Sequence, residues 1–413
     1  MRLLFIHPNF PAQCRHLAAW FGSKPDCEVV FATANPRREW TIPGVKKAVY
    51  TVKPAKNDPF SQPLFDASAH GLAVLKRCLQ LRNRGFYPDV IYGYSGWGGT
   101  WFIRDVFPNA RFVSVVEWYF DAQSEDSLCG RKTPIAAEYA AHLRLRNTVI
   151  LHDLASSDQV LTATHWQRQQ FPARFRDHIA VVHEGIDTEY FSPQANAALE
   201  IPGLALTGEE KIITYANRGM EPYRGFPQFI QALPQIFEKT PDCHVVIAGS
   251  DRVCYGAARE DGRSWKEAML EQVSLPTGRV HFVGSLPYGQ YRTLLRHSSV
   301  HVYLTRPFVL SWSCLEAMAC GCLVVGSDTA PVREVIHHGE HGLLANFFSP
   351  TDIASNVTAV LQGKVPARQI RNSARQRICD NFDLNHLLLR QIELLTGTTA
   401  AYGTAKIQQA CGD

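Results

Sequence analysis

The sequence predicts an α/β protein built from two doubly wound parallel sheets. Short apolar runs alternate with longer amphipathic stretches along the whole chain, which is typical of repeated strand–helix units around a parallel sheet. The alternation stops between about Gly185 and Glu210, where Pro193 and Pro202 accompany several glycines, and it starts again at Lys211. This interruption indicates two sheets joined by a linker.

The expected strands follow the apolar runs of the two halves. Helical periods fill the gaps at roughly the 10 to 15 residues that strand–helix units need. In the first half the strands are Leu3 to His7, Val29 to Thr33, Asp89 to Tyr92, Arg111 to Val116, Gln159 to Thr162 and Ile179 to His183. In the second half they are Lys211 to Ala216, His244 to Ala248, Val280 to Val283, Val300 to Leu304, Leu323 to Gly326 and Gly342 to Ala345.

The chain after the last expected strand is predicted to be helical, over Thr351 to Gln362 and about Ala367 to Leu395. Such a tail can cross back onto the first domain. The last dozen or so residues, rich in Thr, Ala and Gly, are expected to be loose. The predicted domains are therefore residues 1–190, a linker over 191–210, a second domain over 211–380, and a C-terminal helix with a loose tail over 381–413.

Composition restricts the class of protein. A chain of 413 residues with 46% hydrophobic and 19% charged residues is an ordinary globular chain, which excludes disorder and fibrous structure. The formal net charge of +4 is too small to attract nucleic acid, but it leaves room for peripheral contact with the inner face of a membrane. No apolar run approaches the roughly 18 residues of a membrane span, and MRLLFIHPNF has a proline where a signal peptide would stay apolar. We expect a cytoplasmic protein.

The cysteines do not form a recognisable framework. Their number, 11, is odd, and no C-x-x-C pair occurs. Cys320 and Cys322 form a C-x-C, but the surrounding residues are typical of a helix end that runs into a strand, and no cluster of His or Cys completes a zinc set. We interpret the two residues as small buried hydrophobic side chains and expect no metal site.

Two open α/β domains place the carboxyl ends of both sheets, where ligands bind in such folds, at a shared cleft. That arrangement suits an enzyme with two substrates. A dehydrogenase or a binding protein can have the same architecture, because a fold does not determine a function. The side chains in the loops after the strands must distinguish between these functions.

A loop with two arginines follows the strand at Lys211 to Ala216. It carries Arg218 and Arg224, six residues apart, and Phe226 then opens a helix. Guanidinium groups in a strand-to-helix loop can fork onto phosphate oxygens, and the helix N-terminus adds partial positive charge, so a diphosphate is the natural ligand. Alternatively, the loop is merely solvated and its arginines pair with Glu221 or with nothing.

A second loop, directly after the strand at Val300 to Leu304, leads into a helix. Ser311 or Ser313 can cap that helix, which leaves backbone N–H groups near Ser311, Trp312 and Ser313 for a second set of phosphate oxygens. Glu316 follows one turn into the helix, where a carboxylate can accept hydrogen bonds from a ribose diol. Otherwise Glu316 only favours the helix dipole.

Other loops after strands carry weaker signals. Gly249 and Gly284 can lie near a nucleotide base, although a glycine after a strand is often only a turn. The loop at Gly93 to Gly99 is glycine-rich and aromatic and can meet an acceptor, or it is a tight connection. His165 opens a probable helix and is interpreted as structural.

Three stretches of the second half resemble glycosyltransferase family 4. They are Leu-Glu-Ala-Met-Ala-Cys-Gly from residue 315, Pro-Val-Arg-Glu-Val-Ile from residue 331 and Gly-Glu-His-Gly-Leu-Leu from residue 339. With the arginine loop, they stand in the family's order and spacing. In the first half the resemblance is looser, and at residues 182–187 Glu184 replaces the usual Asn. The resemblance, which covers nearly the whole chain, implies the GT-B fold of two facing Rossmann-like domains and a retaining, metal-independent enzyme.

The resemblance also implies roles for individual residues. Arg218 is similar to the family's diphosphate arginine, and Arg224 takes the place of its lysine partner. Glu316 is similar to the second glutamate of an E-x7-E motif, the ribose ligand, whereas the first glutamate, which contacts the transferred sugar, falls at Phe308. Residues 7–11 replace the family's glycine-rich first loop. Glu117 stands at a strand end that often carries a histidine; it either hydrogen-bonds a sugar hydroxyl, takes an acceptor proton, or is only a strand-end charge.

The function implied is transfer of a sugar from a nucleotide diphosphate sugar to an acceptor hydroxyl with retention of configuration, in bacterial-type glycan, polysaccharide or glycoconjugate synthesis. The acceptor is a glycan, a lipid-linked molecule or a protein. Because Phe308 replaces a sugar-contacting carboxylate, a catalytically weak nucleotide-sugar-binding or scaffold subunit is an alternative, as is another GT-B-type enzyme such as an epimerase or a phosphorylase. A nicotinamide dehydrogenase is disfavoured, since no G-x-G-x-x-G follows the first strand.

Overall fold

The structure, a computed structural model, describes the chain except residues 55–56, 195–197 and 398–413. It consists of two compact units. One contains Met1–Gly185 and, from Asn385, nearly all of the last helix, and the other contains Ile186–Leu384. Each unit is described by itself.

The first unit is built on a sheet of seven parallel strands in the order β3-β2-β1-β4-β5-β6-β7. The order reverses between β1 and β4, which are hydrogen-bonded neighbours. This is the topological switch point of a doubly wound sheet. The strands are β1 (Arg2–Ile6), β2 (Glu28–Thr33), β3 (Val45–Val49), β4 (Val90–Tyr94), β5 (Arg111–Val115), β6 (Gln159–Thr162) and β7 (Ile179–Val181).

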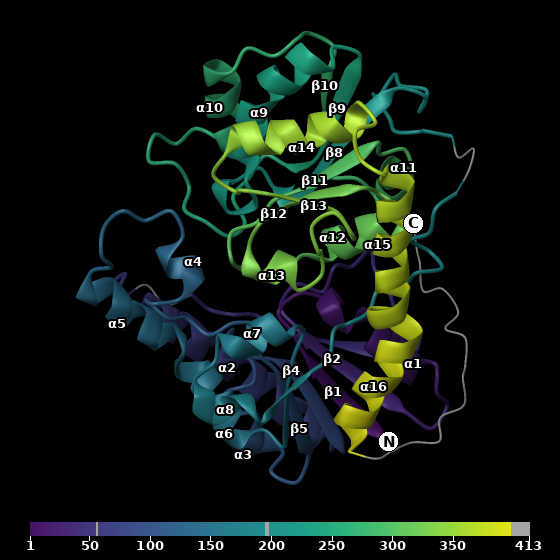
Figure 1. Cartoon of the computed structure of the whole chain (residues 1–413). Helices are drawn as coiled ribbons and strands as arrows, with labels where there is room; N and C mark the ends of the chain where they lie inside the picture. Colours follow the sequence, from purple (N-terminus) through teal and green to yellow (C-terminus); the bar gives the residue numbers. More distant parts are fainter. Residues whose placement is uncertain (55–56, 195–197, 398–413) are drawn as a thin grey trace. The chain divides into compact units, whose positions relative to one another are not determined.

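Helices lie between these strands in the chain (Figure 1). The longest is α2, which packs against α3 and α5. The helices are η1 (Ala12–Cys14), α1 (Arg15–Gly22), α2 (Gln62–Asn83), α3 (Ile103–Val106), α4 (Glu125–Leu128), α5 (Ala137–Arg146), α6 (Thr148–Ser156), α7 (His165–Gln169) and α8 (Ala173–Arg176).

The predicted strands of both units are confirmed to within a few residues, and one strand was missed. Central strands such as β1 and β4 are almost entirely buried and therefore appear as continuous apolar runs. β3 instead contains Lys46 and Lys47, and of its five residues only Ala48 is buried. It is an edge strand, and its charged residues, which are common at sheet edges, hide it from an apolar pattern.

The second unit is built on a sheet of six parallel strands in the order β10-β9-β8-β11-β12-β13, with the switch point between β8 and β11. The strands are β8 (Lys211–Gly219), β9 (Cys243–Ser250), β10 (Val280–Gly284), β11 (Val300–Tyr303), β12 (Val324–Ser327) and β13 (Leu343–Ala345). The helices are η2 (Pro222–Arg224), α9 (Phe226–Lys239), α10 (Trp265–Gln272), α11 (Tyr288–Arg296), α12 (Trp312–Ala319), α13 (Ala330–Arg333), α14 (Pro350–Leu361) and α15 (Ala367–Asn381). α9 and α14 lie side by side (Figure 1) and bury their apolar residues in one core.

The described part of the segment expected as a linker packs onto the second unit. Leu199, Ile201, Leu204 and Leu206 are buried in one cluster with Ile212 of β8. The structure divides the chain between Gly185 and Ile186 instead. The prolines and glycines of this segment prevent a periodic pattern but do not prevent its leucines from covering the sheet.

The C-terminal tail returns to the first unit, as predicted. The helix expected over Ala367 to Leu395 is two helices, α15 and α16 (Leu384–Thr396). Between them the Ile186 N–H donates to the Phe382 carbonyl at 2.8 Å, and the Leu384 N–H donates to the Ile186 carbonyl at 2.9 Å. Within the first unit, Arg111 Nε donates to the Leu395 carbonyl of α16 at 3.0 Å. The tail expected to be loose lies outside the described residues.

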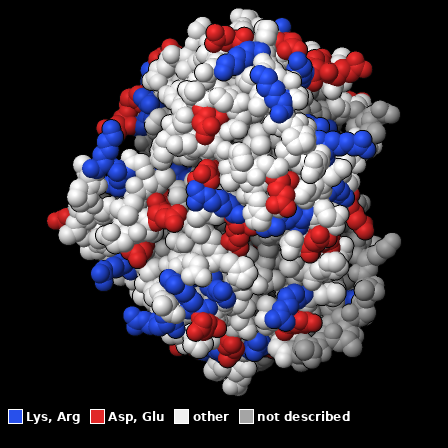
Figure 2. Space-filling model, viewed as in Figure 1, with Lys and Arg blue, Asp and Glu red and all other residues white. Residues whose placement is uncertain are grey.

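Three further findings bear on the composition analysis. No helix in the described part of the chain combines the length and apolarity needed to cross a bilayer. Cys320 and Cys322 are both buried, as expected of small hydrophobic residues. On the face shown in Figure 2, Lys and Arg residues are interspersed with Asp and Glu residues.

Candidate functional site

The loop after β8 places its two predicted arginines differently. Arg218, at the end of β8, is exposed and makes no hydrogen bond or ion pair with another described residue. Arg224, at the end of η2, is only 4% exposed. Gly225 follows with φ of 67°, and a Cβ there would lie 2.5 Å from the Leu304 Cβ, so the tight turn into α9 requires glycine. One arginine is thus available to a ligand, and the other is built into the protein.

Arg224 joins the loop after β8 to the loop after β11. Its Nη1 donates to Thr305 Oγ1 at 2.7 Å, to the Val309 carbonyl at 3.1 Å and to Tyr303 Oη at 3.3 Å. Its Cζ lies 4.9 Å from the centre of the Tyr255 ring, a cation–π distance. Arg224 therefore fixes the geometry of this edge of the sheet.

Glu221 has a role that the sequence analysis missed. It does not form an ion pair with either arginine. Instead, its completely buried Oε2 accepts hydrogen bonds from the backbone N–H groups of Cys254 at 2.7 Å and Tyr255 at 2.8 Å. These residues lie in the loop after β9. Glu221 and Arg224 together hold three loops at the carboxyl edge of the sheet, and neither the distances along the sequence nor the residue types predicted this.

Phe308 stands in an aromatic cluster with Tyr223 and Tyr255. Its ring centre lies 5.3 Å from that of Tyr223 and 5.5 Å from that of Tyr255. Arg224 Cζ lies 6.0 Å from the Phe308 ring, and Arg306 Cζ lies 5.0 Å from the Tyr223 ring. The position at which the family has a carboxylate is thus occupied by an aromatic ring among cations.

The start of α12 is capped from within the protein. Ser311 is the N-cap; its Oγ accepts from the Ser313 N–H at 3.3 Å, and its own N–H donates to Tyr303 Oη at 2.8 Å. The N–H groups of Ser311 and Ser313, expected to be open to phosphate, therefore have protein partners. Trp312, between them, is half-buried.

Glu316 is held in place by a tyrosine from α11. The residue is only 4% exposed, and its Oε1 accepts from Tyr288 Oη at 2.8 Å. Burial, followed by the charge of Glu316, raises the pKa of Tyr291 well above its usual range, which places a second α11 tyrosine close to this carboxylate. Sequence spacing did not indicate this hydrogen bond between Tyr288 and Glu316.

Gly284 lies at the carboxyl end of β10, with φ of 69° and no atom within 4 Å of where a Cβ would stand. Nearby, the hydroxyls of Ser250 and Ser285 are 2.8 Å apart and link the ends of β9 and β10. The predicted residues of the second unit thus follow β8, β10 and β11 at one edge of its sheet. Ligands bind at this edge, by the switch point, in open α/β sheets.

The first unit has a polar cluster at the corresponding edge of its own sheet. Glu117, just after β5, is half-buried; its Oε1 accepts from Gln13 Nε2 at 2.7 Å, and its backbone carbonyl accepts from Gln167 Nε2 at 2.9 Å. Glu184, after β7, accepts from Tyr94 Oη at 3.2 Å. Burial, and then the charges of Glu184 and Glu117, raise the pKa of the Cys14 thiol well above its usual range. The carboxylates of Glu117 and Glu184 therefore both lie close enough to Cys14 to affect its pKa. The sequence analysis identified only Glu117 as a candidate site residue.

Comparisons with known proteins identify the family of the chain. Residues 25–191 match the family described as "Glycosyl transferase family 4 group", and residues 199–377 match "Glycosyl transferases group 1". The chain belongs to glycosyltransferase family 4. The predicted resemblance is thereby confirmed.

Its curated relatives within these glycosyltransferases are distant. A phosphatidyl-myo-inositol mannosyltransferase of Propionibacterium freudenreichii is 25% identical over 60% of this chain and 63% of its own length. An alpha-maltose-1-phosphate synthase of Mycobacterium tuberculosis is 26% identical over 80% of this chain and 85% of its own length. The chain thus spans less than two thirds of the mannosyltransferase.

Solved structures show the GT-B fold. Sucrose-phosphate synthase from Thermosynechococcus elongatus has a TM-score of 0.74 at 18% identity, covering 95% of this chain and 98% of that one. HepE from Anabaena, solved in complex with UDP and glucose, has a TM-score of 0.72 at 15% identity, covering 96% of this chain and all of the other. At these identities the likeness concerns the fold alone.

Proposed function

We propose that this glycosyltransferase moves a sugar from a nucleotide diphosphate sugar to an acceptor hydroxyl, with retention of configuration and without a metal in the transfer step. The observation that carries the proposal is the edge of the second sheet, where the exposed Arg218 and the buried, oriented Glu316 follow strands on both sides of the switch point. A cation and a fixed carboxylate are the groups that a diphosphate and a ribose diol require.

Each residue has a distinct part in this mechanism. Arg218 binds the diphosphate and stabilises the charge that grows on it as the sugar departs, which is commonly the largest catalytic contribution. Arg224 holds the loops after β8 and β11 together, with its guanidinium group against the face of the Tyr255 ring. Glu316, aligned by Tyr288, accepts hydrogen bonds from the ribose. The helix end at Ser311 to Ser313 adds partial positive charge.

The first unit is proposed to bind the acceptor. Glu117 presents a half-buried carboxylate that can accept a hydrogen bond from a sugar hydroxyl or take its proton, and Gln13 orients it. A glycan, a lipid-linked molecule or a protein can supply the hydroxyl. Synthesis of a bacterial-type polysaccharide or glycoconjugate in the cytoplasm, with peripheral contact at the inner membrane face, remains the setting that we propose.

The experiment is calorimetric titration of UDP, GDP and ADP, each with and without EDTA. UDP is placed first because structures of the HepE neighbour contain UDP or UDP-glucose. Wild type is compared with Arg218→Ala and with Arg368→Ala, an exposed arginine of α15 in the same unit. We expect one nucleotide to bind with or without EDTA, and only Arg218→Ala to weaken it. Absence of binding by any nucleotide would contradict the proposal.

A second candidate function, binding of a nucleotide sugar without transfer, is favoured by one observation. The ring of Phe308 packs with Tyr223 and Tyr255 at the position where a sugar-contacting carboxylate was expected. A chain that binds a nucleotide sugar but shows neither transfer nor hydrolysis of the donor would be a binding or scaffold subunit. Conversion of the free nucleotide sugar without an acceptor would instead indicate an epimerase. Product analysis with the nucleotide that binds separates the three.

A further inference from the structure

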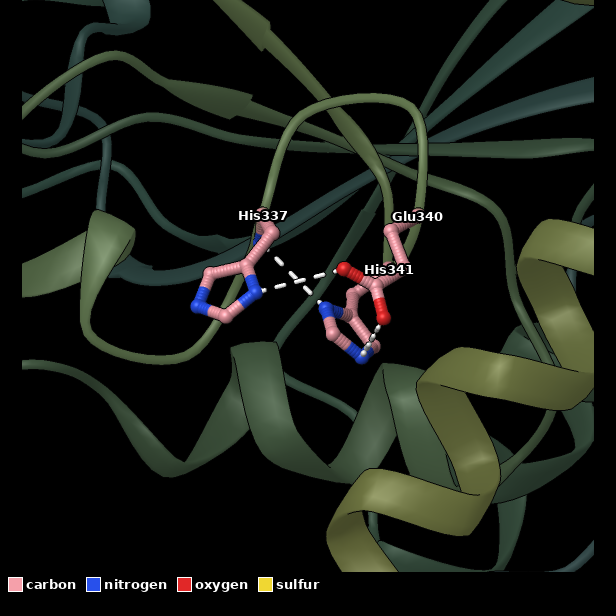
Figure 3. A group of neighbouring side chains, drawn as sticks. All are labelled: His337, Glu340 and His341. Atoms are coloured by element: carbon pink, nitrogen blue, oxygen red, sulfur yellow. Dashed lines mark hydrogen bonds and ion pairs between the residues drawn. The ribbon is translucent and has the colours of Figure 1, made fainter.

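A group of potential metal ligands lies in the loop between α13 and β13 and has no part in the proposed transfer. It consists of His337, Glu340 and His341 (Figure 3). Within the described ranges, this is the group of three such side chains whose donor atoms all lie within 4.8 Å of one another. In Figure 3 the Glu340 carboxylate points between the two imidazole rings.

The backbone of this loop brings the three side chains together. The His337 carbonyl accepts from the N–H groups of Glu340 at 3.1 Å and His341 at 3.0 Å. Gly339, with φ of 79°, donates its N–H to the Gly342 carbonyl at 2.8 Å and closes the turn. Because three backbone hydrogen bonds already form within the loop, the ligands are positioned before any ion arrives, which limits the entropy lost on binding.

The distances fit a zinc ion. His337 Nδ1 lies 3.3 Å from Glu340 Oε2, and His341 Nε2 lies 3.6 Å from Glu340 Oε1. Two ligand atoms bound to a tetrahedral zinc at about 2.0–2.1 Å are roughly 3.3–3.4 Å apart. All three ligand atoms lie within 4.8 Å of one another, and the His337 and Glu340 side chains, 54% and 61% exposed, are free to rotate toward a common ion.

The placement of His341 also suits a ligand. Its side chain is only 7% exposed, so the backbone around it fixes where its ring nitrogens lie. His341 Nδ1 lies 3.4 Å from the His337 N–H, a long hydrogen bond. Coordination through Nε2 leaves the ring proton on Nδ1 and sacrifices only that weak contact.

We infer that His337, Glu340 and His341 form a binding site for a divalent transition-metal ion, with Zn²⁺ as the ion that two imidazoles and one carboxylate favour. Three protein ligands leave one position of a tetrahedron for water. The spacing His-x-x-Glu-His also occurs on helices of zinc peptidases, where the Glu is a base. Here the five residues form a turn, so Glu340 is the third ligand and not a base.

The site is separate from the proposed nucleotide site. Its loop leads into the start of β13, and a Cβ on Gly342 would lie 2.7 Å from the carbonyl of Val324, the first residue of β12. The loop therefore lies at the amino edge of the parallel sheet, whereas Arg218 follows β8 at the carboxyl edge. The ion would brace the connection between α13 and β13, and the transfer chemistry does not depend on it.

The test is equilibrium binding of Zn²⁺ to the full chain after removal of any histidine tag and of metal by dialysis. We expect one zinc ion per chain. His337→Asn and Glu340→Gln change exposed side chains, so the fold should be preserved, and each is expected to weaken zinc binding at least about tenfold. The matched control is His338→Asn, since His338 Nδ1 accepts from the Leu344 N–H at 3.0 Å and an asparagine oxygen can replace it there.

Two readouts distinguish this site from other zinc ligands. Co²⁺ bound by nitrogen and oxygen gives visible bands without the intense near-ultraviolet bands of thiolate ligation, so cysteine binding would be recognised. Zinc should also raise the unfolding temperature of wild type and of His338→Asn, but not of His337→Asn. Failure of wild type to bind one ion at tens of micromolar zinc, or equal losses in the His338→Asn control, would overturn the assignment. Nucleotide titration of the same variants is expected to be unchanged.

Discussion

The two units have the same kind of sheet but opposite chemistry at the corresponding edge. In the first unit the loops after β5 and β7 present the carboxylates Glu117 and Glu184, which are held by Gln13 and Tyr94. In the second unit the loops after β8 and β11 carry the exposed Arg218, and the guanidinium groups of the buried Arg224 and of Arg306 lie against an aromatic cluster.

In open α/β sheets the carboxyl edge is where ligands bind, and the side chains of its loops determine which ligand binds there. A cationic edge with one fixed carboxylate suits a nucleotide diphosphate, and an acidic edge suits a neutral, hydroxyl-rich acceptor. The comparison therefore predicts that variants in one unit change donor binding and variants in the other change the use of acceptor.

The largest effect is expected from Arg218→Ala. Loss of a cation that stabilises the departing diphosphate should lower kcat/KM by about 100- to 1,000-fold, or roughly 3–4 kcal/mol of transition-state stabilisation. Because Arg218 is exposed and has no described partner, the free energy of unfolding should change by less than about 0.5 kcal/mol. Steady-state kinetics and denaturant unfolding measure the two. Arg368→Ala is the control, and wild-type turnover in Arg218→Ala would remove this residue from the site.

Arg218 and Arg224 show that the sequence could not distinguish an exposed arginine from a buried one. Both were predicted from a strand-to-helix loop, and nothing local distinguishes them. Arg224 is buried because Thr305 and Val309, some 80 residues later, supply its acceptors. Glu221 likewise appeared to be an arginine partner, yet it binds backbone N–H groups of the loop after β9. Contacts of this kind arise from tertiary packing and have no local sequence signal.

The strands were predictable for the opposite reason. A strand that is buried on both faces must be apolar along its whole length, so its signal is local. Glu316 could be chosen as a candidate because it belongs to a continuous family motif, whereas its hydrogen-bond partner Tyr288 comes from another helix and has no such signal. His337, Glu340 and His341, the group proposed to bind a metal ion, are close in sequence but were not considered, because the sequence analysis looked for metal ligands around Cys320 and Cys322.

The next effect in size concerns stability and a buried acid of the first unit. Burial raises the pKa of Asp153 on α6 to about 6, despite the hydrogen bond from Thr100 Oγ1 at 2.6 Å. Since its folded pKa lies above the unfolded value of 3.8, the folded state binds more protons between these values, and stability falls as the pH rises through this window. At pH 7 the cost is about 3 kcal/mol.

Asp153→Asn should therefore be more stable than wild type at pH 7 by up to about 3 kcal/mol, and the advantage should disappear near pH 4. Urea unfolding at both pH values measures it. A constant difference between the variants across this range would show that Asp153 is not protonated preferentially in the folded state. Nucleotide affinity should not change, because Asp153 lies in the first unit.

A smaller effect is expected from Glu316→Gln, which tests the carboxylate of the donor edge. Loss of charged hydrogen bonds to the ribose should weaken nucleotide binding by about 2 kcal/mol, or roughly 30-fold. The 2′-deoxy nucleotide should bind Glu316→Gln and wild type more nearly equally than the ribonucleotide does. Calorimetry with both nucleotides makes this comparison. An unchanged preference for the ribonucleotide would place the ribose elsewhere.

Tyr288→Phe provides the companion variant. It removes the hydroxyl that donates to Glu316 Oε1 while leaving the ring among its aromatic neighbours Phe191 and Tyr291. A carboxylate that is less well oriented should bind the ribose more weakly, by about 1 kcal/mol. If Tyr288→Phe weakened binding more than Glu316→Gln, the tyrosine itself would be the ligand.

The last variant, Glu117→Gln, tests the function of the acidic edge of the first unit. The amide keeps an oxygen that can accept from Gln13, so the fold should be preserved while the charge is lost. If Glu117 only hydrogen-bonds the acceptor, kcat/KM for the acceptor should fall about tenfold, with nucleotide affinity unchanged. A fall of about 100-fold or more, with loss of the acidic limb of the pH profile, would make it a general base. Glu138→Gln on α5, an exposed carboxylate of the same unit, is the control. Loss of nucleotide binding in Glu117→Gln would contradict the division between a donor unit and an acceptor unit.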